Sequence, residues 1–423
     1  MKAAIGGLVS GALTSRTLRG AARAASASVR RISGARPQVH YFHDVADPYA
    51  QLSAQLLARL VRDLEVDCSV HLVPPPDEGA APERQKLAEY SLRDAVRLAA
   101  ATGLAFPADA HAPEARAIEA VEGALAGVKD ASAFAEKAVA LGETMWRSAP
   151  ISAPPTGDAD AARAEGGALR EKLGHYLGGA FAFEGEWYWG PDRYAYLEER
   201  LDFARRSGTP FVHLHEDSVP SADARGATLD YFLSPRSPYT YLAAVRVRKL
   251  AERMNATLRY RFVLPMVMRG LPVPPAKRMY IVRDAKREAD RNGMEFGRVA
   301  DPVGPGAERG LAVLHHALRE GKGGAFAESF LAGVFSEAID SATDSGLWKL
   351  AERAGLSRAM VDAALKDESW RDVAEANRTE MFGLGVWGVP SFRVAGRAAH
   401  WGQDRLWAVA QDLRDVASNG AGV

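Results

Sequence analysis

The feature that most constrains this chain is a repeat at a nearly constant spacing. Residues 39–49 read VHYFHDVADPY and residues 229–239 read LDYFLSPRSPY, and each run ends in Pro-Tyr before a helical pattern. The matching tripeptides begin at Asp47 and Ser237, which occupy the same place in their runs. Self-similarity at a fixed spacing indicates a structural unit that occurs twice.

Two further matches follow in the same order. A tyrosine, an aspartate and an arginine recur at the spacing that separates Asp47 from Ser237, and a Trp-Gly-x-Asp-Arg stretch recurs at a longer spacing. The matching residues are Tyr90, Asp94 and Arg97 with Tyr280, Asp284 and Arg287, and Trp189 to Arg193 with Trp401 to Arg405. The longer spacing of the last match indicates an insertion inside the second copy.

This repeat predicts four segments. We expect a basic flexible tail at 1–37, a degenerate first unit at 38–205, a linker at 206–227 and a second unit at 228–418. The linker is rich in Pro, Ser and Asp, which is typical of a connecting segment.

The tail has seven basic side chains before the first acidic residue, Asp44, with Ala, Ser and Gly between them. That composition is typical of a transit peptide and equally of a disordered basic tail. Both interpretations stay open, so organelle targeting is an alternative to a cytoplasmic location.

Each unit has the same order of predicted elements. A strand leads to a helix and a second strand, at 66–73 in the first copy and 257–264 in the second, and a helical block follows. Two short strands and a helix close the unit. The order predicts an α/β protein made of two tandem thioredoxin-like folds, each with an α-helical insertion domain.

Composition limits the partners. Lys plus Arg and Asp plus Glu both number 53, so no basic footprint for nucleic acid exists, and no 18-residue apolar run could span a membrane. The single cysteine, Cys68, excludes an intramolecular disulfide, a CxxC pair and a cysteine-based zinc cage. A reducing, cytoplasmic compartment fits, and Cys68 in an alternating strand is expected to be a buried structural residue.

Four stretches of the second copy resemble the DsbA-like thioredoxin superfamily. Within that superfamily they are most similar to the 2-hydroxychromene-2-carboxylate isomerases and the kappa-class glutathione transferases. The stretches are YFLSPRSPYTYLA, PPAKRMYIVRDAKREA, GVWGVPSFRV and HWGQDRLW, and in this order they extend over nearly the whole span of residues 229–410. The resemblance implies glutathione as the cofactor and Ser237 as the catalytic serine.

The residues at this position support the same chemistry. Redox members of the fold carry CxxC where this chain has Ser237-Pro238-Tyr239-Thr240, so disulfide exchange lacks its thiols. Ser is a good N-cap, Pro suits the first helical position, and a helix start favours an anion. A hydroxyl there can donate a hydrogen bond to a glutathione thiolate and lower the thiol pKa. A plain helix start remains the alternative.

The resemblance implies further site residues. Val389 precedes a cis Pro390, and its backbone would pair with the cysteinyl part of glutathione like an added strand. Gln403 and Asp404 begin a helix and would hold the γ-glutamyl group, although the family usually has Asn or Ser at the position of Gln403. A turn proline and a helix cap are the structural alternatives.

The resemblance also implies that the helical domain covers the site and forms an aromatic substrate pocket. We assign Tyr239, Lys277 and Tyr280 to that pocket, with a solvated salt-bridged stripe as the alternative for the helix at 276–291. Ser234 stands where the family usually has aspartate. We expect no metal, because the cluster from His213 to Asp217 lies in a polar linker.

The first copy lacks these thiol-handling elements. Asp47 replaces Ser237, and an anion there would raise the pKa of a bound thiol. Gly178-Gly179 replaces Val389-Pro390. We therefore expect a structural half, which could act as a pseudo-dimer partner within one chain. For the whole chain the leading expectation is a glutathione-dependent isomerase of an aromatic catabolite. A kappa-type glutathione transferase and a non-catalytic scaffold are the alternatives.

Overall fold

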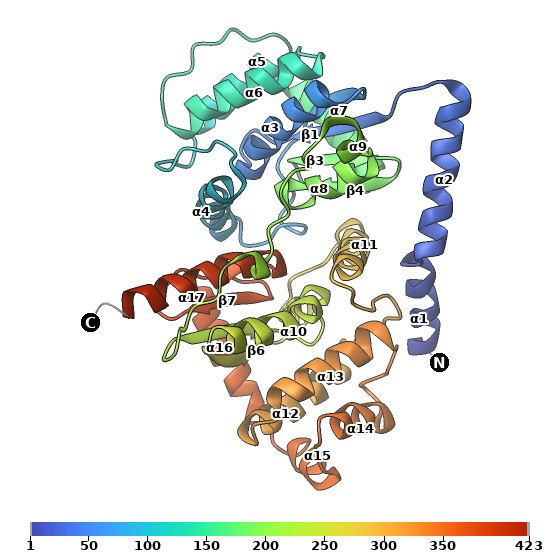
Figure 1. Cartoon of the computed structure of the whole chain (residues 1–423), viewed down its shortest axis with the longest axis vertical. Helices are drawn as coiled ribbons and strands as arrows, with labels where there is room; N and C mark the ends of the chain where they lie inside the picture. The colour runs from blue at the N-terminus through green and yellow to red at the C-terminus, as the bar shows by residue number, and fades with distance from the viewer. Residues whose placement is uncertain (1, 421–423) are drawn as a thin grey trace. The chain divides into compact units, whose positions relative to one another are not determined.

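The computed structural model describes residues 2–420, which divide into two compact units (Figure 1). The N-terminal unit comprises residues 20–214 together with 274–277. The C-terminal unit comprises residues 1–19, 215–273 and 278–423. The boundary at 214 falls inside the predicted linker, while the predicted domain limits themselves stay a prediction.

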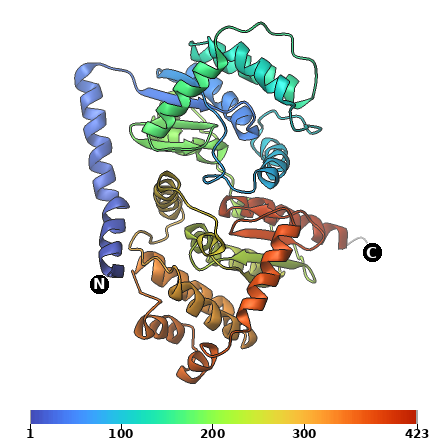
Figure 2. The ribbon, with the colours of Figure 1, turned by 180° about the vertical axis from the view of Figure 1, so that it is seen from behind.

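The N-terminal unit is built on a four-stranded sheet in the order β2-β1-β3-β4. Strands β1 and β2 are parallel, and β3 is antiparallel to both β1 and β4. The strands are β1 (Gln38–His43), β2 (Asp67–Leu72), β3 (Ala180–Phe183) and β4 (Glu186–Trp189). The helices are α3 (Pro48–Asp63), α4 (Arg84–Thr102), α5 (Ala115–Ala126), α6 (Ala131–Trp146), α7 (Ala159–Lys172), α8 (Gly190–Arg200) and α9 (Phe203–Ser207). Helices α4 to α7 form the insertion, in which α5 and α6 lie side by side (Figure 2).

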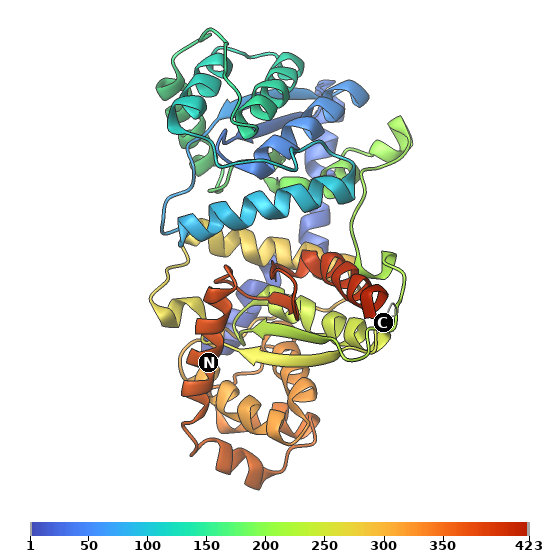
Figure 3. The same ribbon diagram turned by 90° about the vertical axis from the view of Figure 1, so that its left-hand side faces the viewer.

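The C-terminal unit repeats this plan with a sheet in the order β6-β5-β7-β8. The strands are β5 (Thr228–Leu233), β6 (Thr257–Phe262), β7 (Ser391–Val394) and β8 (His400–Trp401). The α-helices are α10 (Pro238–Arg253), α11 (Pro275–Arg291), α12 (Pro305–Arg319), α13 (Gly323–Ser336), α14 (Asp344–Arg353), α15 (Arg358–Ala364), α16 (Trp370–Gly383) and α17 (Leu406–Gly420). The 3-10 turns are η1 (Glu216–Ser218), η2 (Met266–Arg269) and η3 (Gln403–Arg405). Helices α12 to α15 gather beyond one side of the sheet (Figure 3).

The two sheets share their register. Gln38 faces Asp67 in the first sheet, and Thr228 faces Thr257 in the second, so the two pairs are related by the same spacing as the sequence repeat. A side-chain hydrogen bond also occurs at corresponding positions of the two copies. Tyr41 Oη donates to the Ala50 carbonyl at 2.9 Å, as Tyr231 Oη does to the Thr240 carbonyl at 2.9 Å. These matches confirm the predicted fold class and agree with a duplication.

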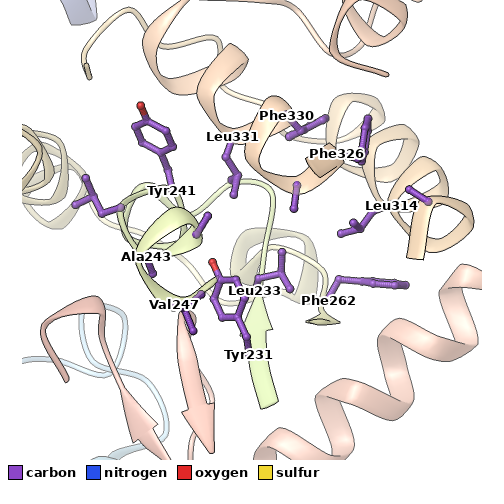
Figure 4. Close-up of a cluster of buried hydrophobic side chains, with 14 of the residues drawn as sticks. Tyr231, Leu233, Tyr241, Ala243, Val247, Phe262, Leu314, Phe326, Phe330 and Leu331 are labelled. Carbon is purple, nitrogen blue, oxygen red and sulfur yellow. The ribbon is translucent and has the colours of Figure 1, made fainter. Parts of the chain in front are cut away.

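The core of the C-terminal unit forms where the alternating face of β5 meets α10 and the insertion. Alternate strand residues point to one face, and residues four apart on a helix share a face, so both elements present apolar stripes. The stripes meet side chains of β6, α12 and α13 (Figure 4). Members include Leu229, Tyr231, Leu233, Ala243, Val247, Phe262, Leu314, Phe326 and Phe330.

The basic N-terminal segment corrects one expectation. Residues that we expected to form a flexible tail instead form two helices, α1 (Lys2–Leu13) and α2 (Arg16–Ser33). In the C-terminal unit, Ser10 Oγ accepts from the Val299 backbone N–H at 3.0 Å, so α1 is held by a specific contact. The apolar residues of α2 recur at helical spacing, which composition alone does not reveal. Within residues 2–420, no helix combines the length and the apolar character that crossing a bilayer requires.

A tyrosine–aspartate contact ties α4 to α3 in the N-terminal unit and α11 to α10 in the C-terminal unit. Tyr49 Oη donates to Asp94 Oδ2 at 2.7 Å, and Tyr239 Oη donates to Asp284 Oδ2 at 2.8 Å. Both aspartates are buried. Because the same contact occurs in both units, we infer that its main role is structural.

We predict that Tyr239→Phe and Tyr49→Phe each lower the free energy of unfolding by about 1–3 kcal/mol, because each leaves a buried carboxylate without one donor. Urea unfolding at neutral pH measures both effects. A loss confined to one of the two variants would contradict a shared structural role.

Candidate active site

The site begins with Ser237 at the start of α10. Ser237 is extended, with φ −93° and ψ 117°, and its Oγ accepts from the Thr240 backbone N–H at 3.2 Å. Pro238 occupies the first turn. The structure thus confirms the predicted N-cap, and the uncapped N–H groups of this helix start create a positive potential.

Ser237 also reaches the segment before β7. Its Oγ donates to the Val389 carbonyl at 3.1 Å, and the Val389–Pro390 peptide bond is cis, as predicted. Among residues 2–420 no other cis peptide occurs, so Gly178–Gly179 is trans. The catalytic and backbone-pairing candidates therefore meet at one end of the sheet.

The loop after β8 closes the same region. The Gly402 backbone N–H donates to the Pro390 carbonyl at 2.9 Å. Gly402 has φ +106°, and a Cβ there would lie 2.5 Å from Asp404 Oδ1, so only glycine suits this close approach. The Asp404 side chain is about one-fifth exposed and lies 3.6 Å from Arg405 Nη1. Asp404 stays a predicted ligand of the γ-glutamyl group.

Gln403 lies differently from its predicted role. It is buried, its Nε2 donates to Glu288 Oε2 at 2.7 Å, and its Oε1 accepts from Arg246 Nη1. Its side-chain amide is therefore engaged with the protein, and any contact with glutathione would have to come from its backbone.

Sequence reasoning missed the residue that completes this network. Glu216 lies in η1, within the segment we expected to be a solvated linker, yet it is buried and accepts two hydrogen bonds from Arg246. Burial alone raises a carboxyl pKa, but the hydrogen bonds and charge of Arg246 outweigh burial and lower the pKa of Glu216. Glu216 and Glu288 therefore flank Arg246 and Gln403 beneath the loop that follows β8.

The predicted substrate residues are only partly brought together. Tyr239 bonds Asp284, and Arg287 Nη1 lies 3.5 Å from the other oxygen of that carboxylate. Tyr280 is buried on the same helix. Lys277 groups with the N-terminal unit, where its Nζ donates to the Ala80 carbonyl at 2.7 Å and burial lowers its pKa. Lys277 is thus not among the side chains that the C-terminal unit itself places beside Ser237.

The corresponding region of the N-terminal unit is closed. A Cβ on Gly178 would lie 2.4 Å from the Asp44 Cβ, and one on Gly179 would lie 3.0 Å from the Ala50 backbone. Ser53 Oγ and the Gly190 N–H both donate to the Gly179 carbonyl. The glycine backbone therefore packs directly on the first helix, where the C-terminal unit has Val389 and Pro390.

Two carboxyls mark this closed region, that of the buried Asp44 and that of the half-buried Asp47. Asp47 caps α3 by accepting from the Tyr49 N–H at 2.9 Å, and Asp44 accepts from the Ala46 N–H at 3.1 Å. Burial raises the pKa of Asp44 to about 7, with a further contribution from Asp47, and burial raises the pKa of Asp47 to about 6. Carboxyls in this setting disfavour a second anion.

Other features lie outside this site. No group of three or more His, Cys, Asp or Glu that could hold a metal is found in the part of the chain that the structure covers. An open surface cavity of about 610 Å³ is lined by residues of α10, β6 and the neighbouring loops, which include Arg225, Arg248, Asn255 and Tyr260. Ser237 is not among its lining residues.

Comparison with known proteins bears on the C-terminal half. Residues 228–414 match the family model described as a DSBA-like thioredoxin domain. The chain therefore contains a DsbA-like domain in that half, together with the two mixed sheets described above. No curated protein matches the chain.

Solved structures give distant likenesses. A 2-hydroxychromene-2-carboxylate isomerase is 21% identical over 46% of this chain and 98% of its own, with a TM-score of 0.40. The cytosolic disulfide reductase DsbM of Pseudomonas aeruginosa, solved with GSH, is 21% identical over 46% of this chain and 100% of its own, with a TM-score of 0.38. A probable DsbA oxidoreductase of Streptomyces coelicolor is 20% identical over 45% of this chain and 90% of its own, with a TM-score of 0.37.

We predict that Glu216→Gln lowers the free energy of unfolding at neutral pH by about 3 kcal/mol, because it breaks a buried ion pair with Arg246. The folded-state pKa of Glu216 is lowered, so its stabilisation is present above the unfolded pKa and lost as pH falls through the folded pKa. Urea unfolding against pH should show the variant and the wild type converge in acid.

Glu252→Gln is the matched control. Glu252 pairs with Arg248 on the same helix but is mostly exposed, so its loss should cost less than about 1 kcal/mol. Equal costs for the two substitutions would contradict the buried network.

We predict that Asp44→Asn stabilises the chain above pH 7 and has little effect in acid. The pKa of Asp44 is raised from 3.8 to about 7, so its burial cost grows as pH rises through this window and is constant above it. Asparagine keeps an acceptor for Ala46. The unfolding midpoint in urea, measured against pH, tests this, with the exposed Asp109→Asn as the control. A gap between variant and wild type that narrows with rising pH would disprove it.

Proposed function

We propose that the C-terminal unit is a glutathione-dependent isomerase of the 2-hydroxychromene-2-carboxylate isomerase type. The observation that carries the proposal is the meeting of the Ser237 hydroxyl, at the start of α10, with the Val389 carbonyl before the cis Pro390. A hydroxyl, a positive helix end and a backbone edge at one point suit a peptide-like ligand that carries a thiolate.

The reaction needs no change of oxidation state. The glutathione thiolate adds to one carbon of a carbon–carbon double bond that is conjugated with a carbonyl in the aromatic substrate. This forms one C–S bond, moves the π electron pair onto the carbonyl oxygen as an enolate, and leaves a single bond between the two carbons. Rotation about that bond follows. Elimination then breaks the C–S bond, restores the double bond and releases the thiolate unchanged.

Ser237 is the proposed catalytic residue. On ligand binding its hydroxyl would turn from the Val389 carbonyl to the thiolate, while its cap of Thr240 is retained. A hydrogen bond to the charged form lowers the pKa of the thiol. Pairing of glutathione with the Val389 backbone and placement of its γ-glutamyl group near Asp404 remain parts of the proposal, as does a substrate pocket beside Tyr239 and Tyr280.

Thiol–disulfide exchange is a poor alternative. The chain has one cysteine, Cys68, which lies in the other unit, and burial raises its pKa to about 12. Dithiol chemistry requires a second thiol at the helix start, and hydroxyls occupy both positions there.

Two alternatives remain. A kappa-type transferase would use the same groups and keep the C–S bond, so labelled glutathione would appear in the product. A non-catalytic scaffold is favoured by the engagement of the Gln403 amide and the Ser237 hydroxyl with the protein itself. Titration calorimetry with glutathione separates this class, since a scaffold should show no binding.

We predict that Ser237→Ala slows turnover of 2-hydroxychromene-2-carboxylate about 10–150-fold, because a hydrogen bond to a charged group is worth about 1.5–3 kcal/mol. The pKa of bound glutathione should rise in the same variant. Thiolate absorbance measured against pH reports that rise. Burial raises the pKa of Cys68 to about 12, so the Cys68 thiol does not ionise, and does not add to the absorbance, near neutral pH.

Asp47→Ala is the matched control, because Asp47 and Ser237 cap corresponding helices. Its loss should cost about 1 kcal/mol of stability as a missing cap and leave turnover nearly unchanged. If Asp47→Ala abolishes activity and Ser237→Ala does not, the active half has been assigned to the wrong unit.

A further inference from the structure

Helix α2 has an apolar face that nothing in its own unit covers. Its apolar side chains recur at the three- and four-residue spacing of one helical face, and each of them is exposed. They are Ala21, Ala22, Ala25, Val29 and Ile32, all in the part of α2 that belongs to the N-terminal unit. In both views of the ribbon, α2 stands apart from the other helices of the N-terminal unit (Figures 1 and 2).

The exposed large hydrophobic side chains are concentrated near the N-terminus of the described chain. Of the ten large hydrophobic side chains that are exposed among the described residues, six lie within the first 33 positions. In the part of α2 that belongs to the N-terminal unit, Val29 is 66% exposed and Ile32 87%. Single exposed hydrophobics are ordinary, but a contiguous face of them marks an interaction surface.

The basic face of α2 explains this orientation. In the N-terminal unit Arg23 donates to both carboxylate oxygens of Glu186, at 2.5 and 2.6 Å, and Arg30 pairs with Glu184. Arg23 and Arg30 are half-buried, whereas the apolar residues between them face outward. Charge pairing thus holds the polar side of the helix inward and leaves the apolar side outward.

We propose that the apolar face of α2 docks on the surface of a bilayer that contains anionic phospholipid. An amphipathic helix with arginines on its polar face and low mean hydropathy lies flat in the interface, with its apolar side among the acyl chains. Such a helix does not cross the bilayer. The lack of an 18-residue apolar run excludes a spanning segment only.

Charge favours this occupant over a second copy of the chain. The first 43 residues contain seven basic side chains and no acidic one. Four of the seven are paired with acidic side chains of the protein, namely Arg16, Arg19, Arg23 and Arg30. Arg31 and Arg36 are exposed and remain able to approach lipid phosphates. An apolar contact between two copies would gain nothing from these flanking arginines, and like charges would oppose it.

The test is co-sedimentation of the full chain with vesicles of phosphatidylcholine and phosphatidylglycerol, compared with vesicles of phosphatidylcholine alone. We expect binding to the anionic vesicles that weakens as salt rises. Val29→Ser and Ile32→Ser should each weaken binding about tenfold, equivalent to about 1.4 kcal/mol, because each side chain loses its place in the apolar layer.

Val303→Ser is the matched control, because Val303 is exposed to 45% but lies outside α2. It should leave vesicle binding unchanged. All three positions are exposed, so circular dichroism should show intact folding, and glutathione binding should be unaffected in every variant. Absence of binding to anionic vesicles, or equal binding by Ile32→Ser, overturns the proposal. So does a dimer in sedimentation velocity that Val29→Ser abolishes, since the occupant is then a second copy.

Discussion

Both units depend on the parallel pairing of their first two strands. Parallel neighbours require a crossover, here α3 or α10, and that crossover helix must start at the carboxyl end of the central strand. The third strand runs antiparallel to the same central strand, so it begins at that same end. This topology alone brings Ser237 within hydrogen-bonding distance of Val389, although the two residues are 152 positions apart in the chain.

Within this shared frame the two units present different chemistry at one point. A helix start offers unpaired N–H groups, and either a hydroxyl or a carboxylate can satisfy one of them. The hydroxyl of Ser237 keeps a hydrogen to donate and brings no charge. In the N-terminal unit the carboxyls of Asp47 and Asp44 lie at this point, and burial raises the pKa of both, so a further negative charge is disfavoured there.

The fold was predictable because its signals are local and occur twice. Strand patterns, Pro-Tyr helix starts and the Trp-Gly-x-Asp-Arg stretch indicated the element order, and the N-cap at Ser237 and the cis Pro390 followed from the motif. The rest depends on tertiary contacts. Glu216 looked solvated because its neighbours are polar, and only Arg246 reveals its burial. No feature of the sequence around Lys277 indicates that this residue groups with the N-terminal unit. The spacing of the apolar residues in α2 indicates a helix, whereas the basic composition of the segment suggested a flexible tail.

The differences between the two sites depend on one another. Only glycine at 178 lets that backbone approach the Asp44 Cβ, and that approach fills the space beside the first helix. With the Gly178 backbone in this position, the role left for Asp47 is to cap α3. A carboxylate fills that role as well as a hydroxyl. Serine at 47 would therefore supply a donor without room for a ligand, and valine at 178 would clash with Asp44. Packing and charge at this position therefore both disfavour a bound anion in the N-terminal unit, which is why we expect that unit to be a structural half.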